Sequence, residues 1–146
     1  MKTRVLIVDD EEKFSHALAE RLRLRDYDVT TSQSGVDAVT HVKKYNYDVV
    51  VLDVLMPGMD GIETLREIKK IKPLTEVIML TGHATVETAI EGMKLGAMDF
   101  LMKPCETEDL VTKIQKAHDR KAEQEERIRE AKAQDIIASP RSVLKE

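Results

Sequence analysis

Short runs of apolar and β-branched residues alternate along the chain with segments in which apolar residues recur every three or four positions. The first pattern is typical of strands, and the second of helices with one buried face. The run at residues 49–52 is apolar throughout, as expected of a strand covered on both faces. The alternation predicts an α/β domain with crossover helices on both faces of one parallel sheet. The predicted strands are residues 4–8, 28–31, 49–52, 76–80 and 99–102.

The helical segments between these strands each carry one apolar stripe that we expect to face the core. Gly96 follows the fourth stripe and is a suitable C-cap residue. The last helix is predicted to begin near Thr107. The stripes are Phe14, Ala17, Leu18 and Leu22; Val36, Val39 and Val42; Ile62, Leu65 and Ile68; Val86, Ala89, Ile90 and Met93; and Leu110, Val111 and Ile114.

The continuation of the last helix, residues 119–134, is too polar for a core. It has five acidic and five basic residues, and Ile128 is its one large apolar side chain. Pairs such as Glu123 with Arg127 each add a few tenths of a kcal/mol, about 0.2–0.5, to such a helix. We therefore expect one folded domain over residues 1–118, a solvent-exposed helical extension over 119–134 and a flexible tail over 135–146, where Ser139-Pro140 breaks the pattern.

Composition restricts the classes of partner. The 23 Lys and Arg against 27 Asp and Glu give a net charge of -4, which does not favour direct binding of nucleic acid. Cys105 is the single cysteine, so no internal disulfide forms and a reducing compartment, the cytoplasm, is expected. No apolar stretch approaches the length of a membrane span, and no association with a membrane is expected.

Polar residues follow the ends of four predicted strands. Asp9 and Asp10 follow the first strand and Asp53 the third, while Thr81 and Lys103 follow the fourth and fifth. In an open parallel sheet the ligand crevice lies outside the carboxyl ends of the strands. The topology therefore predicts that these residues converge in one site.

Three carboxylates in one crevice repel one another by about 4 kcal/mol per pair at 4 Å in an effective dielectric of 20, unless a cation lies between them. Oxygen ligands without histidine favour Mg²⁺, or else Mn²⁺, over Zn²⁺. Such an ion binds phosphate oxygens, and Lys103 and Thr81 suit the equatorial oxygens of a phosphoryl group. Asp53 is then the natural nucleophile for an aspartyl-phosphate.

Each of these residues also has a purely structural interpretation. Asp10 alone could be a helix N-cap, Thr81-Gly82 a helix start and Lys103-Pro104 an ordinary loop. Their coincidence at four strand ends favours the site. Packing or surface roles are expected for Cys105 and for the scattered histidines.

Four segments, VLIVDDE, VVLDVLMPGMDGIE, IMLTGHA and GAMDFLMKP, resemble the response-regulator receiver family between Arg4 and His118. The resemblance implies a flavodoxin-like, doubly wound (βα)5 fold with strand order 2-1-3-4-5. The segment from Thr81 to Pro104 is similar to receivers of NtrC-type transcriptional activators, although the chain has no phosphate-loop motif and no recognisable helix-turn-helix. The roles implied by position are Asp9 and Asp10 as the acidic pair, Asp53 as the phosphoacceptor, Thr81 as the switch hydroxyl, Phe100 as the switch aromatic and Lys103 as the family's lysine.

The resemblance also implies the metal ligands. Asp10, Asp53 and the backbone carbonyl of Leu55 would bind Mg²⁺, with Asp9 acting mostly through water. The Lys103-Pro104 bond resembles the family's cis peptide, and X-Pro bonds are those that adopt cis at low cost.

The function that the resemblance implies is a two-component switch and not an enzyme with a separate substrate. A sensor histidine kinase or a phosphotransfer protein would phosphorylate Asp53, and the domain would promote its own phosphotransfer and dephosphorylation. The surface of the fourth helix, fifth strand and fifth helix would then change, and the chain could form a homodimer on phosphorylation.

Three other functions fit the sequence less well. An aspartyl phosphohydrolase would need a second carboxylate two residues after the nucleophile, and that position is Leu55 in the segment Asp53-Val54-Leu55. A degenerate docking receiver would have lost the acidic pair, the acceptor or the lysine. A flavin phosphate would meet the acidic loop Asp9-Asp10-Glu11-Glu12 and be repelled.

Overall fold

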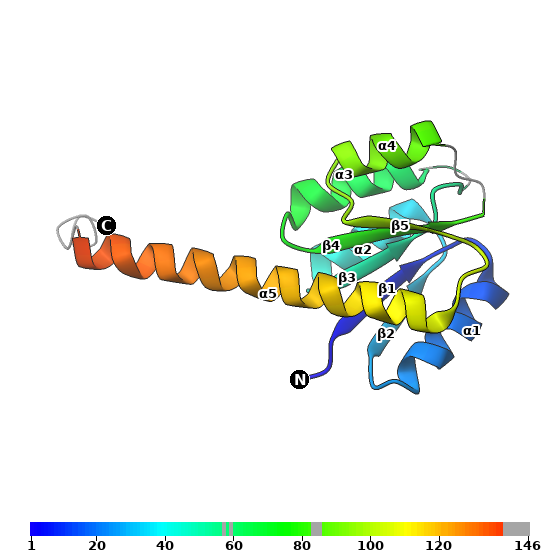
Figure 1. The fold of residues 1–146 in the computed structure, drawn as a ribbon. Helices are drawn as coiled ribbons and strands as arrows, with labels where there is room; N and C mark the ends of the chain where they lie inside the picture. Colours follow the sequence, from blue (N-terminus) through cyan, green and yellow to red (C-terminus); the bar gives the residue numbers. More distant parts are fainter. Residues whose placement is uncertain (57, 59, 83–85, 139–146) are drawn as a thin grey trace.

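A computed structural model of the chain describes residues 1–56, 58, 60–82 and 86–138. Strands and helices alternate through the chain, as the sequence predicts (Figure 1). Two strands are one residue longer than predicted, because β2 includes Ser32 and β4 includes Thr81. The elements are β1 Arg4–Val8, α1 Glu12–Arg23, β2 Asp28–Ser32, α2 Gly35–Lys44, β3 Val49–Leu52, α3 Gly61–Ile71, β4 Glu76–Thr81, α4 Val86–Lys94, β5 Asp99–Met102 and α5 Thr107–Ala138.

The strands form one parallel sheet in the order β2-β1-β3-β4-β5. β3 lies at its centre, with Val50 paired to Leu6 on one side and to Val77 on the other. All four residues of β3 are buried, which explains its unbroken apolar sequence. The predicted fold class and strand order are confirmed.

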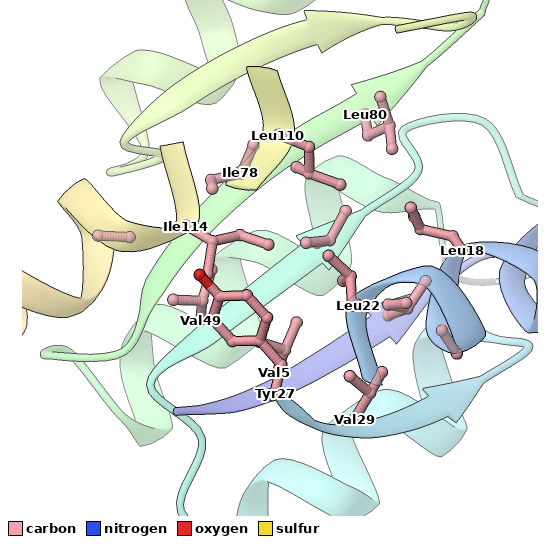
Figure 2. Packing of buried hydrophobic residues seen from close by; sticks show 14 residues of the cluster. Val5, Leu18, Leu22, Tyr27, Val29, Val49, Ile78, Leu80, Leu110 and Ile114 are labelled. Atoms are coloured by element: carbon pink, nitrogen blue, oxygen red, sulfur yellow. The ribbon is translucent and has the colours of Figure 1, made fainter. Parts of the chain in front are cut away.

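Side chains that alternate along each strand build two hydrophobic cores, one on each face of the sheet. Helices α1 and α5 cover one face, where Leu18, Leu22, Leu110 and Ile114 pack against the strands (Figure 2). We call this layer the α1/α5 core. Helices α2 and α3 lie over the other face. The buried residues of this second core include Leu6, Val8, Ala38, Val42, Val50, Leu52, Leu65, Ile68, Val77 and Met79.

The predicted buried stripe of α4 is wrong for its three large residues, while Ala89 is half-buried. Val86, Ile90 and Met93 are 77%, 50% and 46% exposed, and Gly92 is the one fully buried residue of the helix. Gly92 faces the sheet and lies close to Met79 of β4. A Cβ atom at this position would overlap the Met79 thioether, so the helix lies this close to the sheet because the residue is a glycine. The large apolar side chains of α4 therefore face outward, although their spacing is typical of a buried helix face.

Helix α2 shows a smaller error of the same kind. Val36 is exposed and Val39 only half-buried, while Gly35, Ala38 and Val42 are buried. The small residues face the sheet because they allow the helix to approach it closely, and the apolar face is rotated by about one position from the predicted one.

Helix α5 leaves the domain after Ala117, its last buried residue. No side chain from His118 to Ile136 is buried, and the helix projects as a rod (Figure 1). It continues to Ala138, beyond the predicted end at residue 134, and the rest of the predicted flexible tail, 139–146, lies outside the described residues. Within the described part of the chain, no helix is long and apolar enough to cross a membrane.

Two ion pairs fix α5 to the amino-terminal edge of the sheet at the point where it leaves the domain. Arg120 Nε lies 3.4 Å from Glu76 Oε2, and Lys121 Nζ lies 3.5 Å from Asp48 Oδ1. Asp48 also accepts a hydrogen bond of 2.8 Å from the amide of Arg4 at the start of β1. We call these two pairs the α5 anchor.

Candidate functional site

The predicted site residues meet at the carboxyl edge of the sheet, as the topology requires. Backbone hydrogen bonds continue the ladder past the strand ends: the Asp53 amide donates to Val8 O at 2.9 Å, and the Lys103 amide to Thr81 O at 3.0 Å. The Asp9 amide is bonded in the same way to β2 at 3.0 Å. The backbone of each of these residues is therefore positioned by the sheet and not by a free loop.

Three carboxylates gather at this edge. Asp9, Asp10 and Asp53 each offer an oxygen within 4.8 Å of the others. Asp9 and Asp53 are buried, and Asp10 is exposed. Asp9 Oδ1 accepts a hydrogen bond of 2.9 Å from the Glu11 amide, and Asp53 Oδ1 accepts one of 3.3 Å from the Leu55 amide. Glu11 is the N-cap residue of α1, so the interpretation of Asp10 as a helix N-cap is wrong.

The ammonium of Lys103 lies among the carboxylates. Its Nζ is 2.6 Å from Asp9 Oδ2, 3.5 Å from Glu11 Oε1 and 3.7 Å from Asp53 Oδ2. Burial raises the pKa of Asp9, although the hydrogen bond from Lys103 acts in the opposite direction. Burial also acts to lower the pKa of Lys103, but its hydrogen bond to Asp9 and the charges of Asp9, Asp53 and Glu11 raise it overall.

One neighbour of Lys103 was not predicted as a site residue. The Phe14 ring, on the first turn of α1, has its centroid 4.1 Å from Lys103 Nζ. The sequence pattern assigns Phe14 to the apolar stripe of α1, and its ring is indeed partly buried against the α1/α5 core. The sequence did contain a signal for this contact, since Phe14 lies four residues after Asp10, in the first turn of the helix that starts beside the carboxyl edge of the sheet.

The remaining predicted residues lie around this centre. Thr81 ends β4 and is fully buried, and Phe100 in β5 is partly buried against the second core. The Leu55 side chain is 60% exposed beside Asp53. The Lys103-Pro104 peptide is cis, which confirms that prediction. Pro57 of the motif VVLDVLMPGMDGIE and His83 of the motif IMLTGHA lie outside the described residues, and Cys105 is partly buried against the α1/α5 core.

The charges and donor atoms of this centre suit a hard divalent cation. Three carboxylates, those of Asp9, Glu11 and Asp53, lie within 3.7 Å of one ammonium group, and Asp10 adds a fourth to the cluster. The clustered donors are all oxygens, which Mg²⁺ and Mn²⁺ prefer. Among the described residues, Asp9, Asp10 and Asp53 form the one group of three or more acidic, histidine or cysteine side chains placed to hold a metal ion.

Comparison with known proteins agrees with this geometry. The transcriptional regulatory protein ZraR of Escherichia coli (strain K12) is 40% identical over 113 residues, which are 77% of this chain and 26% of ZraR. The uncharacterized transcriptional regulatory protein YkoG of Bacillus subtilis (strain 168) is 36% identical over 116 residues, which are 80% of this chain and 51% of YkoG. The chain thus spans only 26% and 51% of the lengths of these two regulators.

Solved receiver structures match nearly end to end. A response regulator receiver domain protein (CheY-like) from Methanospirillum hungatei JF-1 superposes with a TM-score of 0.82 at 27% identity, covering 85% of this chain and 99% of that one. A receiver domain protein from Clostridium thermocellum gives a TM-score of 0.79 at 36% identity, covering 82% and 97%. Residues 5–115 match the family described as the response regulator receiver domain. The resemblance in sequence is therefore confirmed, and the chain belongs to the receiver domains of two-component response regulators.

Proposed function

We propose that Asp53 accepts a phosphoryl group from a sensor histidine kinase or a phosphotransfer protein, in a reaction that depends on Mg²⁺. The observation that carries this proposal is the placement of Asp53. Its buried carboxylate has the Lys103 ammonium 3.7 Å away and the Asp9 and Asp10 oxygens within 4.8 Å. One carboxylate that can act as a nucleophile, one cation and two further carboxylates thus lie together at the carboxyl edge of the sheet.

In the proposed step, a carboxylate oxygen of Asp53 attacks the phosphorus of a phosphohistidine. The new O–P bond forms as the P–N bond breaks, and the leaving imidazole keeps the electron pair and takes a proton from solvent. Lys103 is placed to hold the phosphoryl oxygens where negative charge gathers. Thr81, at the end of β4, would supply a hydroxyl to the same oxygens once they are present.

A bound Mg²⁺ would neutralise the carboxylates so that an anionic donor can approach. Asp10, Asp53 and the Leu55 carbonyl would hold it, with Asp9 acting through water. The cluster of oxygen donors fits this ion, as described above. Lys103 already balances part of the charge on Asp9, so the ion would complete a neutralisation that the protein begins.

The domain would act as a switch with one phosphoryl group per cycle, and not as an enzyme with a released product. We expect two residues to link the site to the surface: Thr81, at the end of β4, and Phe100, in β5. The surface beside them is apolar and exposed, which suits an interface. We call it the α4–β5 face, formed by Val86, Ile90, Met93 and Met102.

Intact mass measurement tests the proposal directly. With acetyl phosphate and Mg²⁺, we expect one added phosphoryl group, stable to acid and released by base or hydroxylamine. Asp53→Asn should remain unlabelled. Asp60→Asn is the matched control, because Asp60 is the N-cap of α3, outside the cluster, and Asn caps equally well. Labelling of Asp53→Asn, or labelling of the wild-type chain without a divalent ion, would contradict the proposal.

We further propose that phosphorylation shifts the chain toward a homodimer through the α4–β5 face and α5. Light scattering behind a sizing column, with and without beryllofluoride as an acyl-phosphate mimic, measures the dimer population. A truncated chain of residues 1–124 keeps the α5 anchor but lacks most of the extension, so it shows whether the α4–β5 face alone supports the dimer. A monomer under every condition would leave the extension as a solvated linker.

A further inference from the structure

The Lys103 ammonium has an aromatic neighbour that the proposed reaction does not use. The Phe14 ring centroid lies 4.1 Å from Lys103 Nζ, well within the range of about 6 Å for a cation–π interaction. Phe14 is also packed against the α1/α5 core. The core therefore fixes the ring, and the ring cannot follow the lysine if the lysine moves.

The four groups around Nζ respond differently to a metal ion. Asp9 and Asp53 lie 2.6 Å and 3.7 Å from Nζ, but a divalent cation in the cluster would draw on both carboxylates and repel the ammonium. Glu11, at 3.5 Å, has a side chain 60% exposed, so water and salt screen its attraction. The Phe14 ring has no net charge, and its attraction for the ammonium does not compete with the metal.

We propose that Phe14 is a positioning residue, whose ring holds the Lys103 ammonium beside Asp53 while a divalent cation engages the carboxylates. The lysine is then in place when phosphoryl oxygens arrive. Phe14 acts through Lys103 and touches neither the metal nor the phosphoryl group. A lysine side chain has a flexible four-carbon stem, so a fixed ring that limits its positions lowers the cost of binding the phosphoryl oxygens. This inference rests on the proposed phosphoacceptor function.

The first test needs no phosphoryl transfer. In the unphosphorylated full chain, the ring current of Phe14 should shift the ε-methylene protons of Lys103 upfield in an NMR spectrum. Phe14→Tyr should keep the shift, and Phe14→Leu, which preserves apolar packing, should lose it. The shift should persist when Mg²⁺ is added, and its disappearance at saturating Mg²⁺ would show that the lysine leaves the ring and would overturn the proposal.

The second test changes the electron density of the ring at nearly constant size. Mono-, di- and trifluorinated phenylalanine at position 14 weakens the negative face of the ring step by step. We expect the labelling rate of Asp53 by acetyl phosphate to fall in the same order, by about two- to fivefold in total. Tyr47 is the matched control, because its ring lies 5.2 Å from Arg4 Cζ at the opposite edge of the sheet. Trifluorophenylalanine there, compared with Tyr47→Phe, should leave the labelling rate unchanged.

The outcomes separate this inference from the proposed function. A wild-type chain that is labelled on Asp53 but shows a flat fluorination series at position 14 overturns the role of Phe14 and leaves the phosphoacceptor function intact. A wild-type chain that is never labelled contradicts the proposed function, and the NMR shift still decides whether Phe14 holds the lysine.

Discussion

Gly61, the first residue of α3, lies directly against the backbone of Asp53, the proposed phosphoacceptor, and of Val54. A Cβ atom at this position would lie 2.4 Å from the Asp53 carbonyl oxygen and 2.4 Å from Val54 Cα. Ordinary contacts between carbon atoms are about 3.5–4.0 Å, so Gly61→Ala requires the two segments to separate by roughly 1 Å. The atoms in the way belong to the backbone, and no rotation of a side chain relieves the overlap.

Two hydrogen bonds oppose this separation. The Gly61 amide donates to Val54 O at 2.8 Å, and the Asp53 amide donates to Val8 O at 2.9 Å. The φ angle of Gly61 is not in the left-handed region, so alanine is allowed there and would gain about 0.4–1 kcal/mol from a less flexible unfolded chain. Overpacking costs about 1–3 kcal/mol, or more where backbone must move. We therefore expect Gly61→Ala to lower the free energy of unfolding by about 2 kcal/mol.

Urea denaturation followed by circular dichroism measures this loss. With a slope of about 2 kcal/mol per M, the midpoint should fall by about 1 M. Gly92→Ala is the comparison, because its Cβ would meet the flexible end of Met79, with Cε 2.2 Å away, and alanine favours the helix by about 1 kcal/mol. It should therefore lose less stability. Since the Asp53 backbone must also shift, Gly61→Ala should be labelled more slowly by acetyl phosphate, and an unchanged midpoint would refute the reasoning.

Three further predictions concern the rest of the domain. Ile114→Ala, in the α1/α5 core, should cost about 2–5 kcal/mol in urea denaturation, and Ile128→Ala on the exposed extension less than about 0.5. Arg120→Ala should cost about 1–2 kcal/mol and more than Glu76→Gln, because it leaves a buried carboxylate without its closest cation; equal losses would argue against the anchor. Although burial acts to raise it, hydrogen bonds from a lysine of α5 and from the next amide hold the pKa of Asp99 below its usual 3.8. Its stabilisation is thus complete above about pH 5 and lost as the pH falls through the lowered pKa, so Asp99→Asn should reduce the stability difference between about pH 7 and about pH 3.

Much of this architecture is readable from the sequence because strand ends and polar residues coincide in it. The run at residues 49–52 is apolar throughout and is followed at once by Asp53, which predicts both a central strand and a carboxylate at its carboxyl end. The same reasoning places Asp9 and Lys103 correctly. In a parallel sheet, residues that directly follow the strands lie at the same edge, so their proximity can be predicted from the strand ends alone.

The errors arise where the choice depends on contacts between distant segments. The spacing of Val86, Ile90 and Met93 is that of a buried face, and only the fit of Gly92 against Met79 decides that this face points outward. The ion pairs of the α5 anchor could not be predicted for the same reason. The charge pattern of residues 119–134 is that of a solvent-exposed helix, and it does not indicate that Arg120 and Lys121 pair with residues of the sheet edge. The cation–π contact of Phe14 was not predicted either. Phe14 occupies an ordinary core position in the helix pattern, and the contact depends on the conformation of the Lys103 side chain, which comes from a distant segment.

The α5 anchor makes the extension a lever. From Lys121 to Ala138 the helix rises about 1.5 Å per residue, a rod of roughly 25 Å with no buried support beyond its base. A rotation of about 10° at the anchor would move the far end by roughly 4 Å, comparable with the radius of a helix side chain shell of about 5–6 Å. A small rotation at the amino-terminal edge of the sheet would therefore produce a larger displacement at the distal end of α5. How much of the rotation reaches the helix would depend on how rigidly the two ion pairs hold it.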